Sequence, residues 1–269
     1  MWTSVISFMN LLLFPAPPSL FLTAMTVVSF VSLVQNGVGE VRGQNCGYSK
    51  FFFSSGGKEA AGKRVSSRVG MLLFYTPALV AAVAAAYFLA DASDRCRLLS
   101  LIFSLHFFKR DFEVLFIHKY SGHIFVDITF IISMSYGMSV VCMTYSQYLT
   151  QGMQAPSLDL KNIGLVLASI GMIGNLYHHY ILSTLRKEGE KGYKVPKGGL
   201  FGLVICPHYL FEITEYIGIF CISQTVYSFF YLIGTAVYLS GRSYATRRWY
   251  ISKFDDFPRN VRALIPFVF

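Results

Sequence analysis

Charged residues are scarce in this sequence. Asp, Glu, Lys and Arg make up only 14% of its 269 residues, whereas an average soluble domain has about 25%. The hydrophobic fraction is correspondingly high, at 54%, and the mean hydropathy is +0.50. Because several apolar runs are long enough to cross a bilayer, the composition excludes an ordinary soluble domain and predicts an all-α polytopic membrane protein.

Cysteine and histidine are also few, which argues against two kinds of metal site. The five cysteines are odd in number and form no CxxC pair, and most lie in or beside apolar runs. We therefore expect them to be small core residues rather than disulfides or metal ligands. The six histidines show no HxxxH or HxxHH spacing, which excludes the iron-dependent membrane desaturases with their several His boxes. No metal site is predicted.

Two motifs are also absent from the sequence, and their absence, together with the net charge, limits the possible functions. The N-terminus lacks a basic n-region, so we do not expect a cleaved signal peptide. No GxGxxG motif follows a strand, so any nucleotide must bind at a non-Rossmann site. The net charge of +9 fits cytosolic loops or sites for anionic ligands better than it fits nucleic acid, which is not expected as a partner.

The apolar runs predict six or seven transmembrane helices within a single membrane domain, residues 1–269. The two most basic connections, 37–68 and 186–198, are separated by four of these spans, so both fall on the same side. The positive-inside rule places that side in the cytosol. The expected spans are 20–34, 69–90, 98–117, 124–148, 163–185, 199–221 and 225–239.

Ionisable side chains interrupt one of the C-terminal spans, and such residues inside a membrane are candidates for function. The segment CPHYLFEITEY, residues 206–216, carries His208, Glu212 and Glu215 at spacings that place all three on one helix face. Two carboxylates in an apolar span need partners, so a functional role is the favoured interpretation. Tyr209 lies one turn from Glu212, and its phenol is a candidate proton donor.

Two other polar clusters have a functional and a structural interpretation of similar weight. Asn175 and His179 are spaced i,i+4 and share a helix face, either as interfacial residues at the end of a span or as ligand contacts. In the segment LHFFKRDFE, residues 105–113, Lys109 and Glu113 have the same spacing. They form either a simple ion pair or part of a cavity lining.

Two basic segments offer contacts for phosphate. The segment RKEGEKGYKVPK, residues 186–197, either sets the membrane topology or binds a phosphate-rich ligand, since Arg gives bidentate contacts and Lys a point charge. The segment GRSYATRRWY, residues 241–250, combines arginines with Trp249 and Tyr250. It suits either lipid headgroups or the phosphates and base of a nucleotide.

Three segments resemble the steroid 5α-reductase family (3-oxo-5-alpha-steroid 4-dehydrogenases), which also contains very-long-chain enoyl-CoA reductase and polyprenol reductase. The longest is 175–269, with LRKEGEKGYKVPKGGLF, a Glu-bearing helix and RRWYISKFDDFPRNVRALIPF. FFKRDFEVLFIHKYS, residues 107–121, and CPHYLFE, residues 206–212, look closer to the enoyl-CoA reductase branch. The expected regions are a variable N-terminal helix and basic loop over 1–68, substrate-side helices over 69–150, and a steroid-reductase-like C-terminal region over 151–269.

The resemblance implies an enzyme of the endoplasmic reticulum membrane. It would reduce a carbon–carbon double bond conjugated to a carbonyl, in an enoyl-CoA or steroid-like enone, with NADPH as the donor. Tyr209 matches the tyrosine of a CPxY motif and is predicted to donate the proton, with Lys109 and Glu113 supporting the site. Expected partners are the lipid substrate, membrane lipids and other enzymes of lipid elongation. The implied nucleotide contacts are Asn175, Arg186, Tyr193, Lys194, His208, Glu212, Arg248 and Tyr250.

The sequence departs from the steroid branch where that branch polarises the substrate carbonyl with a Tyr/Glu pair. The matching positions are Phe107 and Tyr75, and Phe107 has no hydroxyl, which argues against a steroid reductase in the strict sense. His179 and His208 stand where that branch has Asp and Asn. Two alternatives stay open. One is a membrane methyltransferase using S-adenosylmethionine, although the Arg-His-Pro order of that class is missing. The other is a catalytically lapsed relative that binds lipid.

Overall fold

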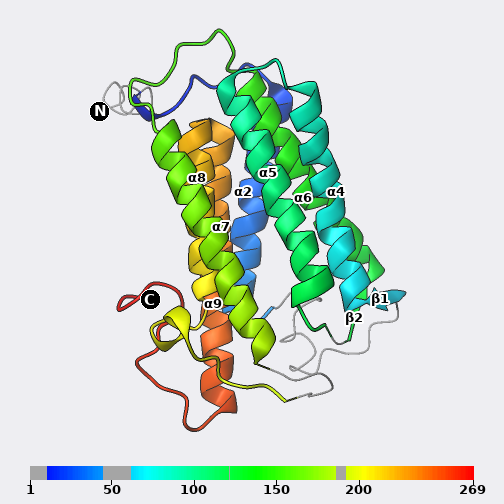
Figure 1. Cartoon of the computed structure of the whole chain (residues 1–269), viewed down its shortest axis with the longest axis vertical. Coiled ribbons are helices and arrows are strands. Elements are labelled where there is room, and N and C mark those ends of the chain that lie inside the picture. The colour runs from blue at the N-terminus through cyan, green and yellow to red at the C-terminus, as the bar shows by residue number, and fades with distance from the viewer. Residues whose placement is uncertain (1–10, 45–61, 121, 186–191) are drawn as a thin grey trace.

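The structure is a computed structural model that describes residues 11–44, 62–120, 122–185 and 192–269. These residues form an elongated bundle of seven long α-helices (Figure 1). A π-helical turn, η1 (Glu113–Ile117), continues α5, and a short 3-10 helix, η2 (Gly199–Gly202), precedes α8. The long helices are α2 (Leu20–Val41), α4 (Ser67–Phe88), α5 (Asp94–Phe112), α6 (Val126–Tyr148), α7 (Lys161–Thr184), α8 (Pro207–Ser223) and α9 (Val226–Lys253).

Successive helices run in opposite directions, which gives the bundle two ends (Figure 1). We call the end where α2, α5, α7 and α9 finish the basic end, and the opposite end the far end. The described residues that flank the connections 37–68 and 186–198 lie at the basic end. The predicted same-side arrangement is therefore confirmed. Residues 45–61 and 186–191, among them Arg186, lie outside the described part of the chain.

Four helices, α2, α4, α6 and α7, are long and apolar enough to cross a membrane. The all-α polytopic membrane fold is thereby confirmed. The other three long helices fall short for visible reasons: α5 carries several charges, α8 has 17 residues, and α9 ends in a basic stretch. The four described cysteines, Cys96, Cys142, Cys206 and Cys221, are free and buried, as predicted.

Local sequence sets where the helices begin. Ser19, Ser66, Ser93 and Thr225 precede α2, α4, α5 and α9, and each side chain accepts a hydrogen bond from a backbone N–H of the first turn. Such caps satisfy donors that the helix itself leaves unpaired. Pro207 opens α8, where its fixed φ and missing N–H are compatible with the first turn.

Three expected boundaries were wrong. The span expected over 225–239 is longer, because α9 continues through the basic segment 241–250 to Lys253. The span expected over 199–221 starts later, because Pro207 opens the helix and the preceding residues form η2 and a turn. The loop expected over 37–68 is shorter, since α2 extends to Val41 and α4 starts at Ser67.

A two-stranded sheet, which the sequence did not suggest, joins the starts of α4 and α6. Strand β1 (Arg64–Ser66) pairs antiparallel with β2 (His123–Phe125), and Val65 faces Ile124. The Arg64 guanidinium lies 4.7 Å from the centroid of the Phe125 ring. The sheet fixes the basic end of α4 against that of α6.

Helices α7 and α8 approach each other closely because small residues line their contact. A Cβ added at Gly218 would lie 2.3 Å from the backbone N of Ala168, and one added at Gly171 would lie 2.3 Å from the backbone N of Glu215. Small residues let two helix backbones meet in a membrane bundle. The contact holds the polar face of α8 directly against α7.

We predict that Gly171→Ala destabilises the protein because the new methyl group collides with the α8 backbone. Overpacking of this kind costs about 1–3 kcal/mol. The matched control is Gly137→Ala in α6, where an added Cβ meets nothing within 4 Å and the helix gains roughly 1 kcal/mol from the better helix former. Thermal unfolding in detergent should show a lower Tm for the first variant alone. Equal behaviour of the two variants would contradict the packing.

Candidate active site

Buried charged and polar side chains gather between α5, α7 and α8 near the basic end. Lys109 is 7% exposed and Glu113 is fully buried. Taking ionised groups out of water is costly unless they are paired and hydrogen-bonded. The role of each buried charged side chain therefore depends on which groups it is paired with. We call this group the charge cluster: Lys109, Arg110, Glu113, Asn175 and His179.

Glu113 is the centre of the charge cluster. Its Oε2 accepts from Nη1 of Arg110 at 2.8 Å. Its Oε1 lies 3.1 Å from Nδ1 of His179 and 3.4 Å from Nζ of Lys109. The expected i,i+4 pair of Lys109 and Glu113 is therefore confirmed. One carboxylate is held by three partners from two helices, which fixes its orientation.

Asn175 connects all three helices of the site. Its Oδ1 accepts a hydrogen bond from Nζ of Lys109, and its Nδ2 donates to the backbone carbonyl of His208 at 2.9 Å. Asn175 and His179 both point into the site from one face of α7, as their i,i+4 spacing predicted. This amide positions the first turn of α8 relative to the cations of α5.

The π-helical turn η1 places His118 close to Glu113. The backbone N–H of His118 donates to the carbonyl of Glu113 at 2.7 Å, and Nε2 of His118 lies 3.9 Å from Oε2 of the Glu113 carboxylate. Short π-helical turns within helices are frequent at functional sites. Burial, together with the neighbouring His179 and Arg110, lowers the pKa of His118 to about 3, so its imidazole is neutral. Burial also raises the pKa of the Tyr120 phenol.

Three of these side chains have the composition of a metal site. The ligand atoms of Glu113, His118 and His179 lie within 4.8 Å of one another. The sequence did not suggest this grouping because the residues come from separate segments. Two cations, Lys109 and Arg110, already contact the Glu113 carboxylate. Their charges repel a divalent ion at this short range, so the arrangement favours an anionic ligand over a metal.

Tyr75 of α4 joins the charge cluster from the other side of α5. Its hydroxyl oxygen accepts from Nη2 of Arg110 at 2.5 Å, and the guanidinium lies 4.6 Å from the centroid of its ring. The rings of Phe107 and Tyr136 lie 6.5 Å and 5.6 Å away. A phenol that accepts from a cation has a more polarised O–H bond. The Tyr75 hydroxyl is thus held directly beside the Arg110 guanidinium.

A further buried contact lies one turn before the charge cluster on α5. Nδ1 of His106 is 2.7 Å from Oε1 of Glu215, which joins α5 to α8. Glu215 is fully buried, and its Oε2 has no hydrogen-bond partner in the described part of the chain. Glu215, one of the two carboxylates expected to need a partner, is therefore paired with His106.

Two further side chains on α8, besides Glu215, have polar atoms without partners in the described part of the chain. Nδ1 of His208 is buried and has no hydrogen-bond partner within the described residues. The ring of His208 lies 5.3 Å from that of His179 and 4.2 Å from that of Tyr209, between centroids. Glu212 is half-buried, and no hydrogen bond or ion pair joins it to the described part of the chain. Buried groups of this kind call for a ligand or water.

The end of α9 and the segment after it form a neighbouring aromatic group. Tyr250 is 6% exposed and its hydroxyl donates to the carbonyl of Lys194 at 3.3 Å. The Tyr193 ring lies 4.8 Å from that of Trp249. Tyr209 packs against the same apolar cluster around Tyr250. The predicted proton donor therefore lies beside the predicted nucleotide contacts rather than within the charge cluster.

The arginines of α9 divide into structural and exposed ones. Arg242 pairs with the buried Glu40 of α2 at 2.8 Å. Arg247 donates to the carbonyls of Val261 and Arg259, which holds the C-terminal segment. Arg248 is exposed. Only the last of these predicted phosphate contacts has its guanidinium turned to solvent.

The predicted site residues fall into two groups, one at the charge cluster and one around the end of α9. Lys109, Glu113 and Asn175 belong to the charge cluster, and His208 and Glu212 border it. Sequence reasoning missed Arg110 as a member, although its i,i+3 spacing to Glu113 was visible. It also missed the pairing of Glu215 with His106, which carried no signal in the sequence. The remaining predicted contacts, Tyr193, Lys194, Tyr209, Arg248 and Tyr250, surround the end of α9, and Arg186 lies outside the described residues.

Comparison with known proteins identifies several relatives of this chain. The protein is 41% identical over 107 residues to "Steroid 5-alpha-reductase DET2" of Gossypium hirsutum, which covers 39% of this chain and 42% of that protein. It is 41% identical over 107 residues to "3-oxo-5-alpha-steroid 4-dehydrogenase 1" of Macaca fascicularis, covering 40% and 41%. The human "3-oxo-5-alpha-steroid 4-dehydrogenase 2" is 30% identical over 169 residues, covering 62% and 66%.

The matched region spans about two fifths of the length of the cotton and macaque proteins. The particular likeness to the enoyl-CoA reductase branch stays a prediction. A family model described as 3-oxo-5-alpha-steroid 4-dehydrogenase matches residues 121–269, more than half of the chain. The protein therefore belongs to the 3-oxo-5-alpha-steroid 4-dehydrogenase family, the steroid 5α-reductases.

Proposed function

We propose that the protein is a membrane reductase of a carbon–carbon double bond conjugated to a carbonyl in a lipid substrate, with NADPH as the donor. Family membership supports the reaction class. The observation that carries the proposal is the charge cluster, in which the fully buried Glu113 holds two cations within a membrane bundle beside polar groups of α8 that lack partners among the described residues. We further propose the endoplasmic reticulum membrane as its location, and a steroid-like enone or an enoyl-CoA as its substrate.

The residues present fit a nicotinamide dinucleotide phosphate. His208 and Glu212 offer unpaired groups for amide and hydroxyl contacts, and Lys194 and Arg248 are exposed cations for phosphate. The aromatic rings around Trp249 offer apolar surface for a base. The cofactor supplies the hydride when bound, and the protein supplies binding, orientation and electrostatics.

Tyr75 is the group we propose to polarise the substrate carbonyl. When a conjugated double bond gains a hydride at its β-carbon, negative charge develops on the carbonyl oxygen. A preorganised donor in a site that excludes water stabilises this charge. The Tyr75 hydroxyl is buried and accepts from Arg110, so its proton is directed away from the guanidinium. Its position on α4 compensates for the missing hydroxyl of Phe107 on α5.

Glu113 and Lys109 have positioning roles in this proposal. Glu113 binds Arg110 and so fixes the guanidinium that polarises Tyr75. Lys109 holds Asn175, which holds the first turn of α8. The assignment of proton donation to Tyr209 stays a prediction. A series of ring contacts and hydrogen bonds leads from Tyr209 through His208, His179 and Arg110 to Tyr75.

The reaction class is tested by NADPH oxidation. We expect the purified protein to bind NADPH and to consume it with a 3-oxo-4-ene steroid or a trans-2-enoyl-CoA, and the preferred substrate identifies the branch. Binding of S-adenosylmethionine in preference to NADPH would indicate a methyltransferase instead. NADPH binding without turnover on either substrate would indicate a lapsed relative.

The variants Tyr75→Phe and Tyr209→Phe test which of the two tyrosines is the acid group that acts on the substrate. We expect Tyr75→Phe to lower kcat by about 10²–10⁴-fold, the usual contribution of a positioned acid, with little change in the Kd for NADPH. Tyr209→Phe should change kcat by much less. If kcat fell in Tyr209→Phe and not in Tyr75→Phe, Tyr209 would be the proton donor.

Glu212→Gln and Glu113→Gln separate cofactor binding from stability. Glu212 has no partner in the described chain, so its amide variant should keep the wild-type Tm while NADPH binds about tenfold more weakly, the loss expected for a hydrogen bond to a charged group. Glu113 neutralises two buried cations, and breaking such a pair costs about 3–5 kcal/mol. Its variant should therefore have a clearly lower Tm. A lower Tm for Glu212→Gln, with unchanged NADPH affinity, would argue against the assignment.

A further inference from the structure

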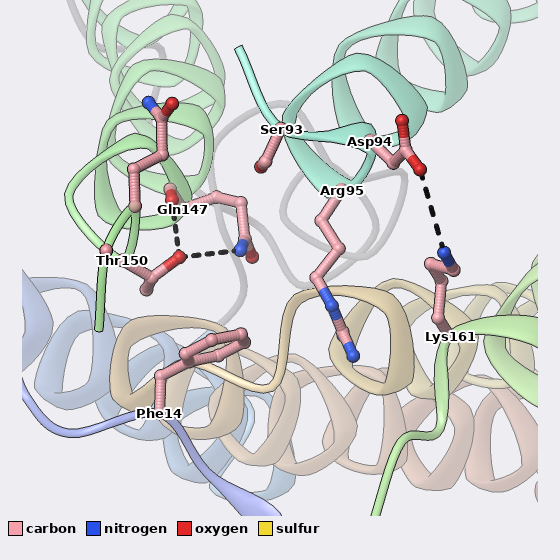
Figure 2. Close-up of a pocket in the computed structure, with 9 residues that line it drawn as sticks. Phe14, Ser93, Asp94, Arg95, Gln147, Thr150 and Lys161 are labelled. Carbon is pink, nitrogen blue, oxygen red and sulfur yellow. Dashed lines mark hydrogen bonds and ion pairs between the residues drawn. The ribbon is translucent and has the colours of Figure 1, made fainter. Parts of the chain in front are cut away.

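A cavity lined largely by polar side chains lies at the far end of the bundle, opposite the charge cluster. Its volume is about 280 Å³, and it lies between the start of α5, the end of α6 and the start of α7 (Figure 2). No residue of the charge cluster lines it. The proposed reduction therefore makes no use of this cavity.

Gln147 places an unpaired acceptor in the wall of the cavity. The residue is fully buried, and its Nε2 donates to Oγ1 of Thr150 at 2.9 Å. Its Oε1 has no hydrogen-bond partner among the described residues. Figure 2 shows the amide turned toward the space enclosed by Ser93, Arg95 and Phe14. A buried acceptor left unpaired costs about 1–3 kcal/mol, so the cavity calls for a hydrogen-bond donor.

Two cations line the same cavity as Gln147. The Arg95 side chain is 11% exposed and is fixed by Asp159 at 2.6 Å and by Oε1 of Gln224 at 3.1 Å. The Lys161 side chain is 29% exposed, and its Nζ lies 4.0 Å from Asp94, at the limit of an ion pair. In Figure 2, Arg95 lies between Gln147 and Lys161. The cavity thus has the Gln147 acceptor in its wall together with two cations, Arg95 and Lys161, and one carboxylate, the exposed Asp94.

We infer that this cavity binds the phosphoethanolamine headgroup of a membrane lipid. The ammonium group supplies the N–H donor that Oε1 of Gln147 lacks, and the phosphate lies beside Arg95 and Lys161. The cavity is formed where α6 ends and α7 begins, and both are membrane-spanning candidates, so it lies at the level of lipid headgroups. A choline headgroup has no N–H to donate and leaves Gln147 unpaired.

Lipid binding to the purified full-length protein tests the inference, and its readout does not depend on enzyme activity. Native mass spectrometry with dioctanoyl lipids compares the ethanolamine, choline and glycerol headgroups. We expect the ethanolamine lipid to bind about tenfold more tightly than the other two, the value of a hydrogen bond to a charged group. Equal binding of the three lipids would overturn the inference. The inference would also be overturned if soluble phosphoethanolamine bound to the protein while the ethanolamine lipid did not.

Three variants locate the site. Gln147→Leu should abolish the headgroup preference, while Gln151→Leu, an exposed glutamine at the rim of the same cavity, should retain it. Lys161→Ala changes a partly exposed side chain with one weak contact, so folding should be unaffected and ethanolamine-lipid binding should fall several-fold. An unchanged preference in Gln147→Leu, or unchanged affinity in Lys161→Ala, would contradict the assignment.

Discussion

The neutralisation of Glu113 by Arg110 and Lys109 is the interaction on which the site depends. A carboxylate with no solvent exposure is tolerable only because two cations and His179 surround it. The same pairing fixes the Arg110 guanidinium, which in turn holds the Tyr75 hydroxyl. One buried charge thereby determines the orientation of groups from α4, α5 and α7.

The close packing of α7 against α8 places α8 beside the charge cluster. Gly171 and Gly218 allow the backbones of α7 and α8 to meet, and Asn175 then reaches the carbonyl of His208. The close approach leaves His208 and Glu212 beside the charge cluster with unused hydrogen-bonding capacity. Such unused capacity next to fixed cations distinguishes a binding site from a purely structural ion-pair network.

The sequence predicted what depends on local pattern. Apolar runs located most helices, and the i,i+4 spacings placed Lys109 with Glu113 and Asn175 with His179. Contacts between distant segments carried no such pattern, so the pairing of His106 with Glu215 and the β1–β2 sheet were not foreseen. The limits of α9 were missed because its last turns are basic and aromatic rather than apolar, and tertiary contacts of Arg242 and Arg247 keep them helical.

In the proposed reaction the enone carbonyl binds at Tyr75 while the nucleotide binds along α8. A structure of the protein with oxidised cofactor and a reduced lipid product tests this most directly. We expect the product carbonyl within hydrogen-bonding distance of the Tyr75 hydroxyl, and the nicotinamide end beside His208 and Glu212. A carbonyl bound at Tyr209 instead, or a nucleotide bound away from the charge cluster, would contradict it.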